Sequence, residues 1–108
     1  MALEKKFKIL IYPGLHTRPG AKFVELCKKF DSDIEIFFND KVANGKSIIS
    51  IMTMAAPQNG EITVKVNGVD EEMLIKELSE WHVEAHKSKE DFDNFPDKHE
   101  LLKAFEII

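Results

Sequence analysis

The sequence predicts an α+β fold in which an antiparallel sheet is covered by helices on one face. Three observations support this prediction. Several short segments alternate apolar and polar residues, which is typical of strands with one solvated side. Other segments repeat apolar residues at helical spacing. The segments follow one another as β-α-β-β-α-β-α with short connections, and strands this close to amphipathic helices favour antiparallel pairing in one domain.

The first strand is expected at residues 5–11, where apolar and lysine side chains alternate until Pro13 and Gly14 end the run. The first helix is expected to begin at Pro19, because proline suits the first turn of a helix, and to end near Phe30. Its apolar stripe is formed by Phe23, Leu26, Cys27 and Phe30.

Three more strands and a short helix follow. Alternation predicts strands at residues 34–38, 41–43 and 62–66, and Asn39-Asp40 is expected to turn the chain between the first two. Ser47 is expected to cap a short helix that ends near Met54, because serine is a favoured N-cap residue.

A third helix is expected after Asp70, which is a favoured capping residue. Its apolar positions predict that it continues to about residue 85. These positions are Leu74, Leu78, Trp81 and Ala85.

Residues 1–86 are expected to form the domain, and residues 87–108 a C-terminal extension with a helix that Pro96 could open. Two interpretations of this extension stay open. It packs back on the domain and covers apolar surface, or it is a docking or dimer-forming element, because an unpacked apolar stripe is a sticky patch. The stripe consists of Leu101, Leu102, Phe105 and Ile108.

Composition and charge exclude several classes of protein. The 108 residues include 15 Lys+Arg and 19 Asp+Glu, a formal net charge of −4, which argues against nucleic acid and anionic membranes as main partners. No apolar run is long enough to span a bilayer, and no signal-peptide apolar region follows Met1. The single cysteine excludes an internal disulfide. We therefore expect a cytoplasmic protein without membrane insertion.

The segment from Gly14 to Val24 carries the strongest functional signal. His16 lies just before the predicted helix, so the free N–H groups of the first turn are near it. Such a helix end binds phosphate, and a neutral imidazole is a nucleophile. Arg18 can hold a phosphoryl group in its planar guanidinium, and the N–H groups of Thr17 and Arg18 are natural donors. We expect a histidine that accepts and passes on a phosphoryl group.

This segment resembles the active-site signature of the HPr family, the histidine phosphocarrier proteins of the bacterial sugar phosphotransferase system. The family pattern Gly-Leu-His-(Ala/Thr)-Arg-Pro-Ala matches at every position except Gly20, where the family usually has alanine. A second signature, Asn44 to Ile49, resembles the segment around the family's regulatory serine. The resemblance extends over about residues 4–86.

The resemblance implies an open-faced sandwich with a four-stranded antiparallel sheet and three helices on one side. It implies that enzyme I phosphorylates His16, on the ring nitrogen closer to the main chain, and that enzyme IIA domains receive the group. It also implies that Ser47 is a target of a dedicated serine kinase, although Ser47 could serve only as a helix cap. No cofactor is implied. Partners are expected to dock on a surface that includes Ala21, Phe23, Ile48, Ile49 and Met52, although the helical stripe places Phe23 in the core.

Alternative functions keep the fold and change the role. A mainly regulatory protein acting through Ser47, or a binding module without phosphotransfer, would need no part in sugar uptake. Glu25 and the extension mildly favour the regulatory alternative, because several family members have lysine where this chain has Glu25. The combination of His16, Arg18 and Pro19 argues against the binding module, because a module that has lost phosphotransfer has no reason to keep all three residues.

The remaining candidates are interpreted as structural. Cys27 lies in the apolar stripe of the first helix and is expected to be a small buried side chain, not a reactive thiol. His82 and His86 are four residues apart on the predicted third helix, a spacing that can bind metal. Without a third ligand we interpret them as surface histidines and predict no metal site. His99 has no recognisable context.

Overall fold

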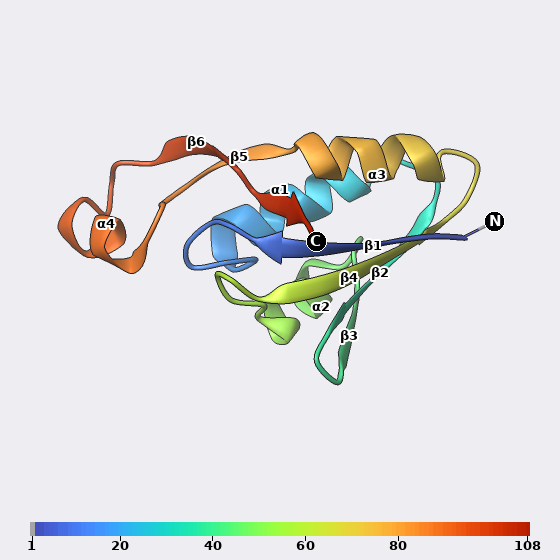
Figure 1. The fold of residues 1–108 in the computed structure, drawn as a ribbon, viewed down its shortest axis with the longest axis horizontal. Coiled ribbons are helices and arrows are strands. Elements are labelled where there is room, and N and C mark those ends of the chain that lie inside the picture. The colour runs from blue at the N-terminus through green and yellow to red at the C-terminus, as the bar shows by residue number, and fades with distance from the viewer. Residues whose placement is uncertain (1) are drawn as a thin grey trace.

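The structure, a computed structural model, describes residues 2–108 and contains helices and strands in alternation (Figure 1). None of its helices is long and apolar enough to cross a membrane. In chain order the elements are β1 (Ala2–Ile9), α1 (Thr17–Cys27), β2 (Asp33–Phe38), β3 (Lys41–Asn44), α2 (Ile48–Met54), β4 (Glu61–Asn67), α3 (Glu71–Glu80), β5 (His82–Ala85), α4 (Lys89–Asn94), β6 (Glu100–Lys103) and β7 (Phe105–Ile107).

The main sheet is antiparallel and has five strands in the order β3-β2-β4-β1-β7. Its central register places Phe7 opposite Ile62 and Ile36 opposite Val64. A separate two-stranded ladder pairs β5 with β6. The predicted α+β class and antiparallel pairing are confirmed, but the predicted count of four strands is wrong, because β7 from the extension adds a strand beside β1.

One face of the sheet is buried and the other is solvated. Side chains alternate along each central strand, as on β4, where Ile62, Val64 and Val66 are buried between more exposed residues. The buried face shares one hydrophobic cluster with α1, α2 and α3, so these helices cover the same side. Helix side chains in this cluster include Phe23, Ile51, Met54, Leu74 and Leu78.

The first helix is shorter at its end than predicted. It begins at Thr17, two residues before the predicted Pro19, and ends at Cys27, three residues before the predicted Phe30. The N–H groups of Lys29 and Phe30 each donate to the carbonyl three residues earlier, Leu26 and Cys27, so the last turn tightens and the helix stops. Phe30 still packs against the core from this turn.

The predicted continuation of the third helix to residue 85 is wrong. Helix α3 ends at Glu80, and residues 82–85 form β5. Val83 and Ala85 are buried whereas His82 and Glu84 are exposed. Every second residue is therefore buried, which is the spacing of a strand and not that of a helix. Strand β6 provides the pairing that stabilises this change, and its residues lie about twenty positions further along the chain.

The predicted helix after Pro96 is also wrong. The short helix α4 lies before Pro96, and the apolar residues of the stripe after it belong to β6 and β7, except Ile108, which lies just beyond β7. They do not share one buried side: Phe105 is fully buried, whereas Leu101 is 68% exposed and Ile108 is 50% exposed. The extension packs back on the domain, as one interpretation expected, but as strands.

Asp70 does not cap α3 with its side chain, contrary to the prediction. Its carboxylate accepts hydrogen bonds from the N–H groups of Asp31 (2.8 Å) and Ser32 (2.9 Å) and from the Ser32 hydroxyl. Ser32 is fully buried, so these bonds tie the segment after α1 to the start of α3. The Ser32 hydroxyl, followed by the Asp31 N–H, holds the pKa of the Asp70 carboxyl below its usual value, because both stabilise the charged form.

Asp70→Asn is expected to destabilise the protein at neutral pH and to have less effect in acid. A carboxyl group whose folded-state pKa is lowered contributes stability above its unfolded pKa, about 3.9 for aspartate, and loses it as the pH falls through the folded value. The difference in urea midpoint between wild type and variant should be full at neutral pH and shrink below about pH 4. Asp33→Asn, an exposed position on β2, is the matched control. A difference that does not change with pH would contradict the prediction.

Candidate phosphoryl-acceptor site

The loop between β1 and α1 holds His16 at one end of the sheet. Leu15 is buried, and its N–H donates to the carbonyl of Ala56 at 3.0 Å. Gly14 has φ +125°, and a Cβ there would lie 2.2 Å from the Ala56 oxygen, so only glycine fits. His16 is the N-cap residue of α1, and its carbonyl accepts the N–H of Gly20 at 2.9 Å. His16 therefore lies at the helix start, as expected.

The first turn of α1 presents two unused donors beside His16. Thr17 has φ +26°, a left-handed conformation that is unusual for a β-branched residue and costs about 1–3 kcal/mol. Within residues 2–108, the N–H groups of Thr17 and Arg18 have no acceptor. Both lie at the positive end of the helix dipole, where an anion is stabilised.

The two ring nitrogens of His16 differ in their surroundings. Nε2 is buried and has no hydrogen-bond partner in the described part of the chain. The residue as a whole is only half-buried, so part of the side chain is open to solvent. Nδ1 is the ring nitrogen closer to the main chain, which is the one that the family resemblance implied. A buried polar atom without a partner costs about 1–3 kcal/mol, and in native structures it can mark a catalytic role.

Arg18 lies at the rim of the same site. Its Nη1 is 3.8 Å from Oε2 of Glu84, and both side chains are more than half exposed. At this distance and exposure an ion pair contributes about 0–1 kcal/mol. The guanidinium can therefore leave Glu84 for a dianionic phosphoryl group at little cost.

A pocket of about 280 Å³ joins these groups to the C-terminal extension. Its walls come from the loop before α1, the start of α1, β5 and the extension. They include His16, Thr17, Arg18, Glu84, Phe92 and His99. The contribution of Phe92 and His99 was not predicted, because no pattern within residues 87–108 relates them to the histidine motif.

His86 anchors this wall. The prediction of a surface histidine on a helix is wrong: His86 is only 5% exposed and follows strand β5. Its ring contacts Phe92 at 5.1 Å between centroids, and its Nε2 lies 3.2 Å from the carbonyl oxygen of Phe95. His82, by contrast, is exposed as expected. No three His, Cys, Asp or Glu side chains within residues 2–108 are arranged as metal ligands.

Comparison with known proteins decides the family. Residues 3–83 match the family model described as PTS HPr component phosphorylation site. The chain belongs to the HPr family. Membership makes it a phosphocarrier protein of the phosphotransferase system, as expected. Such a protein carries a phosphoryl group and is not itself an enzyme.

Individual HPr proteins match at similar levels. Phosphocarrier protein HPr of Buchnera aphidicola subsp. Baizongia pistaciae is 40% identical over 78 residues, which are 72% of this chain and 92% of the relative. The protein of the same name from Buchnera aphidicola subsp. Acyrthosiphon pisum is 43% identical over 76 residues, 70% of this chain and 89% of the relative. The crystal structure of HPr from Bacillus anthracis superposes with a TM-score of 0.68 at 33% identity, covering 69% of this chain and 89% of that one. These names support the carrier function and not the regulatory alternative.

Ser47 caps α2 as predicted. Its side-chain oxygen accepts the N–H of Ser50 at 3.2 Å, and the residue is partly exposed. The neighbouring Lys46 is engaged, because its Nζ donates to the carbonyl of Phe30 at 2.6 Å. In this HPr protein Ser47 is therefore a partly exposed residue held at the start of α2.

The residues expected to dock HPr partners lie on adjoining helices. Ala21 on α1 is exposed, and Ile48 and Ile49 on α2 are 41% and 76% exposed. Met52 is half-buried between these helices. Phe23 is fully buried, as its helical stripe predicted.

Gly20, the departure from the HPr pattern, faces Met52. A Cβ on Gly20 would lie 2.8 Å from the terminal methyl of Met52 and 3.2 Å from the Leu15 oxygen. The methionine therefore fills the space that an alanine side chain would occupy at this position. The absence of Cβ permits close packing of α1 on α2, in addition to the backbone freedom that a helical glycine brings.

Cys27 is a structural residue, as expected. It is fully buried on α1, and burial raises the pKa of its thiol to about 12, against an opposing effect of the Lys46 charge. The thiolate that reacts with oxidants or metals is therefore not formed at neutral pH.

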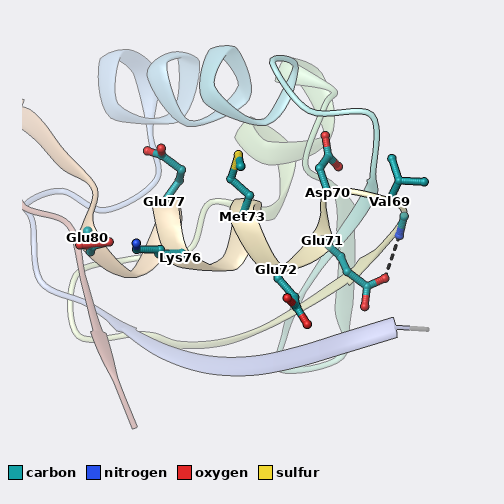
Figure 2. A pocket seen from close by; sticks show the side chains of 9 residues that line it. Val69, Asp70, Glu71, Glu72, Met73, Lys76, Glu77 and Glu80 are labelled. Atoms are coloured by element: carbon teal, nitrogen blue, oxygen red, sulfur yellow. Dashed lines mark hydrogen bonds between the residues drawn. The ribbon is translucent and has the colours of Figure 1, made fainter.

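A second hollow, which His16 does not line, lies over α3 and the turn before it. Figure 2 shows acidic side chains, including Asp70, Glu72 and Glu77, spread along this element around Met73. Val69 and Met73 are 95% and 62% exposed there. This hollow contains no nucleophile beside a free helix donor, so it has none of the chemistry of the His16 site.

Proposed function

We propose that Nδ1 of His16 accepts a phosphoryl group from phosphorylated enzyme I and passes it to an enzyme IIA domain. The observation that carries this proposal is a half-buried His16 at the N-cap of α1, next to the Thr17 and Arg18 N–H groups that have no acceptor, with Nε2 buried so that Nδ1 is left for the phosphoryl group. In each transfer the bond from phosphorus to the donor breaks as the bond to the acceptor nitrogen forms. The donor leaves with the electron pair of the broken bond.

The surroundings favour the phosphorylated state without holding it permanently. The N–H groups of Thr17 and Arg18 and the guanidinium of Arg18 provide charge-assisted hydrogen bonds for the phosphoryl oxygens. Glu84 competes for the same guanidinium from 3.8 Å. A carrier needs this balance, because a group bound too tightly would not move on to the next protein.

Labelling tests this proposal. Incubation with enzyme I and phosphoenolpyruvate should place one phosphoryl group on each chain, and the product should be labile in acid and stable in alkali. Nuclear magnetic resonance of the product should show the phosphorus on Nδ1. An acid-stable product, or no product with a competent enzyme I, would overturn the proposal. Addition of a IIA domain should then remove the label.

We also propose that Ser47 is a regulatory phosphorylation site. Ser47 is partly exposed at the start of α2, and a phosphate at the start of a helix is electrostatically favourable. Phosphorylation of Ser47 would leave α2 folded and place negative charge beside Ile48 and Ile49. It would thereby repel acidic partners from the docking surface.

Ser47→Ala is expected to abolish an acid-stable phosphate that a serine kinase and ATP produce on the wild type. Loss of the cap should also lower stability by about 1 kcal/mol, measured by urea unfolding. Ser50→Ala is the matched control, because Ser50 lies one turn away and its hydroxyl accepts the N–H of Asn44. Equal labelling of wild type and Ser47→Ala would show that the kinase modifies another residue.

A further inference from the structure

The segment formed by residues 89–97, named here the α4 tip, stands out at the end of the molecule where β1 leads into α1 (Figure 1). It is anchored by aromatic contacts. Phe92 packs on Tyr12 of the loop before α1, with ring centroids 5.7 Å apart, and on His86 at 5.1 Å. The carbonyl of Phe95 lies 3.2 Å from Nε2 of His86. The tip is therefore fixed against the loop that holds His16.

The α4 tip and the His16 site share one pocket. Phe92 contributes to a wall of the same pocket that His16, Thr17 and Arg18 line. A protein that brings a reactive group to His16 must therefore lie against the tip as well. The tip offers apolar surface to such a protein, since Phe92 is 41% exposed and Phe95 is 59% exposed.

The charges of the two neighbouring surfaces are opposite. The α1 side carries Arg18, Lys22, Lys28 and Lys29 against Glu25, which pairs with Lys22 at 3.6 Å. The tip carries Glu90, Asp91, Asp93 and Asp97 against one lysine. That lysine, Lys89, is bound to Asp93 at 2.7 Å, so the remaining carboxylates of the tip have no basic partner within residues 2–108.

We propose that the α4 tip is a second docking surface, continuous with the one around His16, that binds the phosphoryl-donor protein through basic and apolar side chains of that protein. This inference rests on the proposed function. The tip selects among donors: one that presents only acidic surface around its reactive group meets like charge at Glu90 and Asp97. Charges at the rim of an interface, such as these, change the association rate more than the dissociation rate.

The test reverses charge on the tip and measures transfer. The variant Glu90→Lys/Asp97→Lys should be labelled by enzyme I of the same organism with a kcat/KM about 10-fold lower, and added salt should narrow the difference. The final amount of label should equal that of the wild type, because His16 is untouched. Phe95→Ala should also lower kcat/KM, because it removes apolar docking surface.

A matched control carries the same charge change elsewhere. Glu72→Lys/Glu80→Lys alters two exposed residues of α3, one of them in a first helical turn like Glu90. It should keep the wild-type kcat/KM, and circular dichroism should show all variants folded. Equal rates for the tip variant and the wild type, or equal losses in both double variants, would overturn the inference. Binding to unphosphorylated enzyme I, measured by calorimetry, tests the tip even if His16 takes no label.

Discussion

Exchange of His16 for alanine is expected to abolish the acid-labile phosphate that enzyme I and phosphoenolpyruvate place on the wild-type chain. The described residues offer no other imidazole at the open end of a helix with unused N–H donors, because His82 follows α3, His86 is buried and His99 lies between α4 and β6. Radiolabelled phosphoenolpyruvate and a gel run at alkaline pH give the measurement. Incorporation should fall to background.

The fold should survive this exchange. The His16 side chain makes no capping hydrogen bond to α1, and removing it eliminates a buried nitrogen that has no partner. His82→Gln, an exposed histidine on β5, is the matched control and should be labelled like the wild type. Arg18→Ala should still be labelled but more slowly, since it removes a phosphoryl ligand and not the nucleophile. Acid-labile phosphate on His16→Ala would place the acceptor on another histidine and contradict the site described here.

Local pattern was sufficient to predict the elements that make the His16 site. Local pattern marked strands β1 to β4 of the main sheet but not β7. Pro19 and Ser47 marked the starts of α1 and α2 to within two residues, because proline and serine act within one turn of their own position. The motif around His16 predicted a histidine at a helix start for the same reason. Each of these features depends on residues that are close in sequence.

The features that could not be predicted depend on distant partners. Trp81 and Ala85 fit a helical stripe, yet β5 forms because β6 pairs with it from residues 100–103. Asp70 has the right type for a cap, but its carboxylate bonds to Ser32, which the fold brings beside it. His86 was predicted to be exposed, but Phe92 and Phe95 of the extension pack against it. Propensity is a weak guide wherever such tertiary contacts compete with it.

Phe105→Ala is expected to cause the largest loss of stability of any single exchange in the extension. Phe105 is fully buried on β7, and its ring contacts Phe7 at 5.4 Å, Trp81 at 5.6 Å and Phe23 at 6.0 Å between centroids. Replacement of a buried phenylalanine by alanine costs about 3–5 kcal/mol, because it removes apolar contacts and leaves a cavity. In a domain of this size that corresponds to a fall in Tm of about 10 °C or more.

Truncation after Lys87 should have a larger effect than Phe105→Ala, because it removes the whole of β6 and β7. Strand β1 would become an edge of the sheet, and the N–H of Leu10 would lose the carbonyl of Ala104, which it meets at 2.8 Å. Thermal unfolding followed by circular dichroism measures both changes. Leu101→Ala is the matched control, because Leu101 lies in the same extension but is 68% exposed, and it should change stability by less than about 0.5 kcal/mol. A Phe105→Ala variant as stable as Leu101→Ala would show that the extension is not part of the core.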